Sequence, residues 1–342
     1  MLSIPDLTEH VTKHADWFEL SALRAPDGRI GFGTLVSAAD LEIEEQEPDI
    51  ADEDLRQEGM VIAVQAEIAQ RLKVIGPDYP FVVDESGAGM QMAGAITPVG
   101  AIYLFCLFLS HAYDRTIIPE SLKPDIDHNA RDLFQVCATV AAAGVVQGIA
   151  TSFGWPRPDE ARFLDAVKRI YGLFGDGTPH VHPPAGAPEQ VKDDGIDVIA
   201  WQPSADGLPG TTNYLLGQAA SGKDWRGKSV VTYITAFHQF WFSRQPASLP
   251  HPAMFMPFCI ESKGGDDAAL TQENLAGLMQ KLTAQFGLIV YRYRMAHYAA
   301  RGLQGREDDG HLVERADDLP QVEQWVQAVS YTHLTLPTNR EV

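Results

Sequence analysis

The chain has 342 residues, of which 45% are hydrophobic, and its formal net charge is −20. This length suggests one large or two ordinary domains, and the composition excludes an intrinsically disordered protein. The negative charge argues against a nucleic-acid partner. However, residues 39–59 alone hold ten acids and one base. The excess of negative charge therefore says little about a site elsewhere in the chain.

Residues 39–59 are best interpreted as a solvated acidic face, and the alternative is a segment that shields a cationic groove or binds a basic partner. The three cysteines lie far apart in apolar stretches. This spacing argues against a disulfide framework or a CxxC zinc site and fits a reducing cytoplasm. The first residues lack the basic-then-apolar order of a signal peptide, so we expect a cytoplasmic protein.

The first 125 residues are predicted to form an α+β domain that serves recognition or partner contact. Residues 17–37 show short apolar runs around a "PDG" turn, which predicts strands. Residues 53–76 have apolar positions at helical spacing, and residues 100–114 predict a second helix. Pro119, Pro124 and the polar stretch between them indicate a domain boundary near residue 125.

The apolar run at residues 92–110, "MAGAITPVGAIYLFCLFLS", is nearly long enough to span a bilayer. Thr97, Pro98 and Gly100 interrupt it, and no Lys or Arg flanks it. We therefore interpret it as a buried core helix and expect no membrane segment.

The second domain is predicted over residues 126–328. Two helical patterns come first and are followed by a Gly/Pro-rich connector, a pair of strands with a long turn, a helix, a strand, a helix, and a strand that runs into a helix. The corresponding residues are 129–148, 154–175, 175–190, 195–203 with 211–221, 228–244, 252–261, 270–287 and 288–300.

The last stretch resembles the translation of a transposon-end sequencing adapter, residue for residue from Val329 to Thr338. We expect residues 329–342 to be read-through of such an adapter and set them aside from fold reasoning.

Asp197 raises a specific question, because it lies in the segment "DDGIDVIAW", which continues into an apolar strand pattern. A buried charge is costly unless it is paired or binds a metal. Side chains alternate along a strand, so Asp197 and Gln218 can converge on one side of the sheet if their strands pair. These two oxygen ligands would suit Mg²⁺. The alternative is an Asp paired with a neighbouring base or lying at a strand edge in water.

The segments "DDGIDVIAW" and "LLGQAASGKDW" resemble the Mrr-like branch of the PD-(D/E)XK restriction-endonuclease superfamily, over roughly residues 130–298. That branch pairs an Asp in a GGxD-type strand with a QxK on the next strand, and a preceding helix often adds an acid. The resemblance implies an α/β restriction-endonuclease-like core, an α-β-β-β-α-β mixed sheet flanked by helices. It matches Asp197 to the metal-binding Asp and Gln218 to the Gln of QxK.

Two positions depart from that pattern. Ala220 occupies the Lys position, and Gln135 occupies the position of the helix acid. In the family, the Lys orients or activates the attacking water and stabilises developing negative charge. Lys223 and Lys228 follow closely, and either long side chain could place its ammonium in the same region.

The resemblance therefore implies Mg²⁺ or Mn²⁺ bound by Asp197, Gln218 and Gln135. Asp193 and Asp194 could supply a carboxylate instead, although turn solvation is the role that we favour for both.

The implied chemistry is metal-assisted phosphodiester hydrolysis. Arg226 lies beside the two lysines, and Arg292 and Arg294 lie at the end of the late strand, so all three are candidates to hold DNA phosphates. The alternative for each is an ordinary surface base.

Our first hypothesis is a Mg²⁺-dependent DNA endonuclease that acts in prokaryotic defence against foreign DNA, with other defence proteins or a second copy of the chain as candidate partners. The second is a catalytically inactive nuclease-fold subunit that acts in binding or assembly, for which Ala220 and Gln135 are the support. A hydrolase of a small acidic substrate has no supporting motif.

Overall fold

The computed structural model describes residues 2–6, 9–37, 50–113, 116–157, 159–211, 213–260 and 272–334. The chain divides into two compact units, one made of Met1–Ile126 with Val322–Val342 and the other of Asp127–Gln321. Val322–Val342 therefore groups with the N-terminal residues, whereas the sequence analysis placed residues up to 328 in the second domain. The acidic segment at residues 39–59 lies partly outside the described residues.

The first unit combines helices with a small antiparallel sheet in the order β1-β3-β2. Its elements are α1 (Val11–Arg24), β1 (Arg29–Gly31), α3 (Ile50–Ile75), η1 (Gly76–Asp78), β2 (Phe81–Val83), β3 (Gly89–Met92), α4 (Pro98–Ala112) and η2 (Glu120–Leu122). α10 (Leu319–Leu334) begins at the end of the second unit. It includes residues 329–334, which the sequence analysis had set aside, and residues 335–342 lie outside the description.

The strand prediction for residues 17–37 is wrong over most of its length, because α1 reaches Arg24 and only Arg29–Gly31 form a strand. The His10 ring nitrogen caps α1 by accepting from the Thr12 N–H at 3.2 Å. Asp16 and Glu19 are three positions apart, so the helix places both carboxylates on one face.

Both carboxylates are buried and are compensated by one fully buried arginine from α3. Arg71 Nη1 lies 2.7 Å from Asp16 Oδ1 and 2.9 Å from Glu19 Oε1. From α4, His111 Nε2 lies 2.7 Å from Asp16, and the Tyr103 hydroxyl donates to Glu19 at 2.8 Å. Buried charges persist in a fold when they are paired in this way.

α4 is the helix predicted from the apolar run, and nearly all of its residues are buried, as expected of a core helix. The Thr97 hydroxyl caps it by accepting from the Gly100 N–H at 3.0 Å. Across the described ranges, no helix has both the length and the apolar character needed to cross a bilayer.

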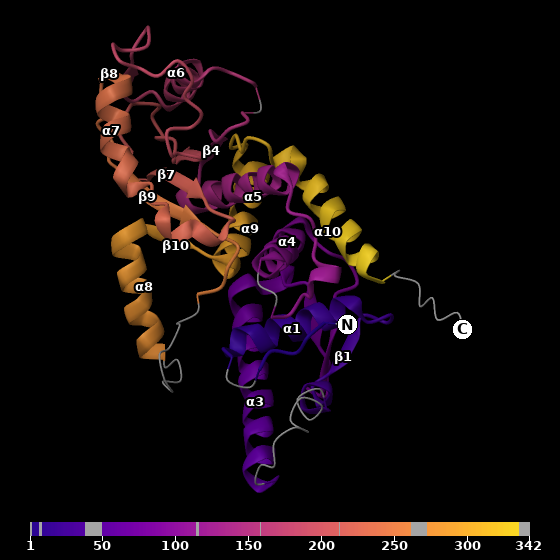
Figure 1. Ribbon diagram of the computed structural model, residues 1–342. Helices are drawn as coiled ribbons and strands as arrows, with labels where there is room; N and C mark the ends of the chain where they lie inside the picture. The colour runs from indigo at the N-terminus through magenta and orange to yellow at the C-terminus, as the bar shows by residue number, and fades with distance from the viewer. Residues whose placement is uncertain are drawn as a thin grey trace. The chain divides into compact units, whose positions relative to one another are not determined.

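The second unit is mixed α/β, as predicted, and Figure 1 shows its strands and helices. In chain order the elements are α5 (His128–Val146), β4 (Ile149–Ser152), α6 (Phe163–Phe174), β5 (Thr178–Pro179), β6 (Val198–Trp201), β7 (Tyr214–Ala219), η3 (Lys223–Gly227), α7 (Val231–Trp241), β8 (Phe242–Arg244), β9 (Pro250–Phe255), α8 (Gln272–Phe286), β10 (Leu288–Val290), α9 (Arg292–Asp309) and η4 (Ala316–Asp318).

A mixed five-stranded sheet forms the centre of this unit, in the order β10-β9-β7-β6-β4. The predicted antiparallel pairing of β6 with β7 is confirmed, with Val198 opposite Gly217 and Trp201 opposite Tyr214. β4 adds antiparallel to β6, whereas β9 and β10 add parallel on the other side. A separate two-stranded pair joins β5 and β8.

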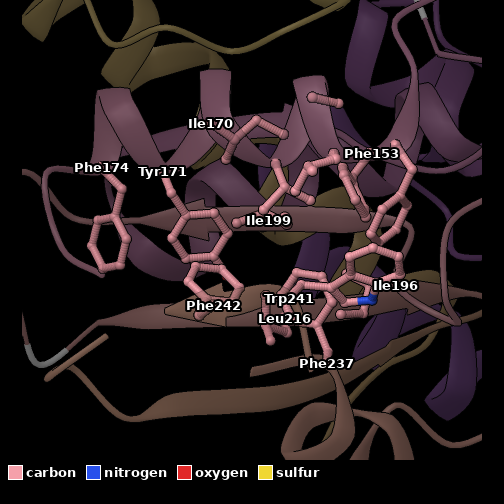
Figure 2. Close-up of a cluster of buried hydrophobic side chains, with 14 of the residues drawn as sticks. Phe153, Ile170, Tyr171, Phe174, Ile196, Ile199, Leu216, Phe237, Trp241 and Phe242 are labelled. Atoms are coloured by element: carbon pink, nitrogen blue, oxygen red, sulfur yellow. The ribbon is translucent and has the colours of Figure 1, made fainter. Parts of the chain in front are cut away.

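An aromatic core covers one face of the sheet, and Figure 2 shows many of its side chains. Ile199 and Leu216 project from the sheet into this core, where α6 contributes Tyr171 and α7 contributes Phe237. Val198 and Ala200 alternate with these positions and are fully buried. α5, which packs against β4, β6 and β7, covers that side.

α5 and α9 pack backbone to backbone, because each presents a glycine to the other. A Cβ on Gly144 would lie 1.8 Å from the Tyr298 carbonyl oxygen, and a Cβ on Gly302 would lie 2.2 Å from the Val140 carbonyl oxygen. Real Cβ atoms do not tolerate such distances, so only glycine permits this close approach.

We predict that Gly144→Ala lowers the free energy of unfolding by about 3 kcal/mol, because a backbone carbonyl cannot move aside without shifting α9. Urea denaturation measures the change. The matched control is Gly277→Ala in α8, where an added Cβ meets nothing within 4 Å; it should be neutral or stabilising by up to about 1 kcal/mol. Equal stability of the two variants would contradict the packing described.

Candidate functional site

Asp197 lies at the point where the ends of three strands meet, immediately before β6. Its N–H donates to the Gly217 carbonyl at 2.8 Å. Its own carbonyl accepts two hydrogen bonds, from the N–H of Phe153 at 2.8 Å and from that of Gly154 at 2.9 Å. Two donors on one acceptor mark a local irregularity of the β-bulge kind, which re-aims the side chain. The backbone of Asp197 is therefore fixed to both neighbouring strands.

The two carboxylate oxygens of Asp197 have different surroundings. Oδ2 accepts from the Ala219 N–H at 2.8 Å. Oδ1 lies 2.7 Å from the position that a Cβ on Gly154 would occupy, and Gln135 Oε1 lies 2.3 Å from the same position. The two oxygens are therefore no more than about 5 Å apart. Glycine at 154 leaves the space that both occupy.

The amide of Gln135 has a defined orientation. Its Nε2 donates to the Ser152 hydroxyl at 2.7 Å, which turns Oε1 toward Gly154 and Asp197. Ser152 is held in turn, because its N–H donates to Glu314 Oε2 at 2.7 Å, and Arg169 pairs with Glu314 at 3.2 Å. The structure thus brings together two of the predicted ligands, Asp197 and Gln135.

Ser152, Gly154 and Glu314 belong to this site, although the sequence pattern did not predict them. Ser152 and Gly154 depend on β4, which was not predicted as a strand. The signal was present: "IATS" after the helix carries two β-branched residues and follows a glycine, Gly148. Glu314 lies far along the chain and reaches Ser152 because the segment around Val313 pairs parallel to Ala150, a contact that no local pattern predicts.

The surroundings of Asp197 favour its neutral form. Burial raises the pKa of the carboxyl to about 7, and the negative charge of Asp193 adds to this. The Ala219 N–H and the positive charge of Lys228 act in the opposite direction. Burial also raises the pKa of Glu314, against the lowering effect of Arg169.

Gln218 is nearly buried, and its Oε1 has no hydrogen-bond partner in the described part of the chain. Along β7 it alternates on the face of Leu216 and Ala220, both of which are buried. Because the backbone is irregular at Asp197, strand alternation does not decide whether the two side chains meet. Their convergence stays a prediction.

Ala220, at the position that the resemblance assigns to a Lys, is not accessible to solvent. Ala220 is fully buried in an apolar cluster with Trp225, Met254 and Ile289. Lys228 is exposed, and its charge reaches Asp197. The side chain of Lys223 lies outside the described residues.

Asp193 and Asp194 belong to the turn that leads into Asp197. Asp193 Oδ1 accepts from the Gly195 N–H at 3.0 Å, and Asp194 Oδ2 accepts from Trp241 Nε1 at 2.9 Å. Asp193 thus stabilises the turn, while Asp194 ties the turn to α7.

The three candidate arginines have different exposures. Arg226 is exposed and lies 4.4 Å above the Trp225 ring. Arg294 is half-buried and donates to the Ile289 carbonyl at 2.9 Å. Arg292 is fully buried, with Nη2 at 2.7 Å from the Cys259 sulfur. Only Arg226 among them presents its charge openly to solvent.

Within the described ranges, no group of three or more His, Cys, Asp or Glu side chains is arranged to hold a metal ion. A cation at Asp197 would therefore depend on amide oxygens, water and substrate for its remaining ligands.

Comparisons of the chain with protein-family models, with curated proteins and with solved structures give no match.

We predict that Asp197→Asn stabilises the protein at alkaline pH in the presence of EDTA. The folded pKa of about 7 exceeds the ordinary value of 3.8, so folding favours the protonated acid. That contribution is lost as pH rises through 7. Asn cannot ionise, so its stability advantage in urea denaturation should widen from pH 5 to pH 8.5, reaching about 1–3 kcal/mol. A difference that does not change with pH would contradict the raised pKa.

We predict that Gly154→Ala disrupts the paired oxygens, because the new methyl group would occupy the space of Asp197 Oδ1 and Gln135 Oε1. It should weaken Mn²⁺ binding measured by calorimetry at least about 10-fold and cost about 1–3 kcal/mol of stability. The matched control is Gly172→Ala in α6, which meets no atom within 4 Å. Unchanged Mn²⁺ affinity in Gly154→Ala would show that these oxygens are not ligands.

Proposed function

We propose that the second unit is a Mg²⁺-dependent DNA endonuclease of the PD-(D/E)XK type. The observation that carries the proposal is the pair of oxygens, Asp197 Oδ1 and Gln135 Oε1, no more than about 5 Å apart. The scaffold supports it: α5, β4, β6, β7, α7 and β9 follow the order helix-strand-strand-strand-helix-strand, with α6 and β5 inserted after β4, η3 before α7 and β8 after α7. The carboxylate lies before the second strand and the amide on the first helix.

The residues present fit a hard divalent cation. Asp197 is a carboxylate whose burial opposes its charge, and a cation would reverse that effect. Gln135 Oε1 is held toward it, and Gln218 Oε1 is buried without a partner among the described residues. A single carboxylate suits Mg²⁺, which commonly keeps water and takes substrate phosphate oxygens as its other ligands. When bound, the ion would supply Lewis-acid activation and a more acidic water.

The protein's own groups would perform distinct tasks. Asp197, fixed through its backbone and through the Ala219 N–H, holds one oxygen in place with little freedom. Ser152 keeps the amide of Gln135 in its orientation. Lys228 is the cation whose charge reaches Asp197, so it is our candidate to stabilise developing negative charge. Arg226 would contact DNA phosphates, as Lys223 would from the same segment.

In this proposal the first unit would serve DNA recognition or contact with a protein partner in cytoplasmic defence against foreign DNA. Its buried carboxylates Asp16 and Glu19 are paired with Arg71, so we assign them no part in the reaction.

A second candidate is a catalytically inactive nuclease-fold subunit. The observation that favours it is Ala220, which is packed into the core where the family has its Lys. This candidate retains the scaffold but predicts neither cation binding at Asp197 nor cleavage.

We predict that the full chain nicks or linearises plasmid DNA in the presence of Mg²⁺ or Mn²⁺ and not in EDTA. Asp197→Ala should reduce the rate at least about 100-fold, more than the loss of an outer-shell partner normally costs. Gel electrophoresis of timed samples measures the rate. Asp165→Ala, which removes an exposed acid from α6, should cleave as the wild type does.

Two results would redirect the interpretation. Equal cleavage by wild type and Asp197→Ala would place the activity elsewhere. Absence of cleavage, together with calorimetry that detects no Mn²⁺ binding dependent on Asp197, would support the inactive subunit.

A further inference from the structure

A cavity of about 630 Å³ adjoins the candidate site. One wall is the loop that leads into Asp197, with Gln190, Lys192 and Asp193, and the other is the outer face of α7, with Gln239 and Phe240. Asp193 links the two places, because it lines the cavity and its charge also acts on Asp197. The volume is in the range of pockets that hold small organic groups.

The loop wall is anchored at two points near its C-terminal end. Arg157 is buried against the rings of Phe153 and Phe163, and its guanidinium donates to the Lys192 carbonyl. Asp194 accepts from Trp241 Nε1 at 2.9 Å. Because one hydrogen bond holds the loop to the core and the other holds it to α7, the part of the wall around Asp193 is positioned without a ligand.

The lining combines a flat apolar ring with neutral hydrogen-bonding groups. Phe240 is 36% exposed, and its ring stands at 89° to that of Trp241, with centroids 4.9 Å apart. Gln190 and Gln239 are exposed at the cavity, and each amide both donates and accepts. A planar heterocycle with donors and acceptors on its edge has the complementary chemistry.

We propose that this cavity takes an unstacked nucleobase of the nucleic-acid substrate, with Phe240 as the stacking surface. The inference rests on the proposed function and deepens it. The cavity lining holds one basic side chain, Lys192, beside Asp193 and Asp194, so it offers a phosphate no net positive charge, whereas stacking does not depend on charge. Because a paired base is inaccessible within a duplex, the substrate would offer a single-stranded or extruded base.

The test measures binding of fluorescently labelled oligonucleotides to the full chain by anisotropy, in EDTA so that no cleavage occurs. The first probe is a single-stranded DNA oligonucleotide with one central purine, and its match carries an abasic site there. The wild type should bind the purine strand about 10-fold more tightly than the abasic strand, since stacking contributes about 1–3 kcal/mol per base. Phe240→Ala should remove that difference, whereas Phe240→Tyr, which keeps an aromatic ring, should retain it.

Leu173→Ala is the matched control, because Leu173 is also an exposed apolar side chain on a helix of this unit; it should bind as the wild type does. Equal binding of the purine and abasic strands by the wild type would overturn the inference. Preferential binding of the paired duplex over the single strand would overturn it as well.

This binding test is separable from the cleavage test. Asp197→Ala lacks the carboxylate but keeps Phe240, so it should retain the preference for the purine strand. A preference for the purine strand without cleavage would support the base-binding cavity and contradict the endonuclease proposal. Cleavage without that preference would support the endonuclease proposal and contradict the base-binding cavity.

Discussion

Within the described residues, the carboxylate of Asp197 takes part in no ion pair, although it lies among the ends of three strands, and the structure around it follows from this constraint. Its backbone closes the junction of β4, β6 and β7, so the residue cannot be moved without opening the sheet. Its side chain needs room beside Gln135, and Gly154 provides that room. A fold selected only for stability would place a neutral side chain here, since unpaired buried charge is costly.

A series of polar contacts leads from Arg169 to Gln135, beside this carboxylate. Arg169 holds Glu314, Glu314 holds the backbone of Ser152, and Ser152 holds the amide of Gln135. Each link is a hydrogen bond or ion pair with a defined direction, so the position of Gln135 Oε1 is set by groups that do not themselves reach Asp197. Such hydrogen-bonded contacts fix the orientation of a buried amide that carries no charge of its own.

The sequence was sufficient where a signal was local. Alternation predicted the β6–β7 hairpin, and apolar spacing predicted α3, α4 and α5. It failed where tertiary contacts override the local pattern: α1 contains a "WF" pair and β-like runs, but buried pairing with Arg71 stabilises a helix there. Of the site, the sequence indicated Asp197 and Gln135 as neighbours through a resemblance alone. It could not indicate Glu314, which arrives from more than a hundred residues away.

The contact between Gly144 and Gly302 joins the first helix of the second unit to its last long one. During synthesis α5 leaves the ribosome before the strands of the sheet and α9 leaves after them. Until α9 is made, α5 lacks the helix that packs against it. Topologies dominated by such distant contacts fold slowly and expose sticky surface meanwhile. We therefore expect the second unit to fold as a whole, and fragments that end before α9 to depend on chaperones or to aggregate rather than to mature.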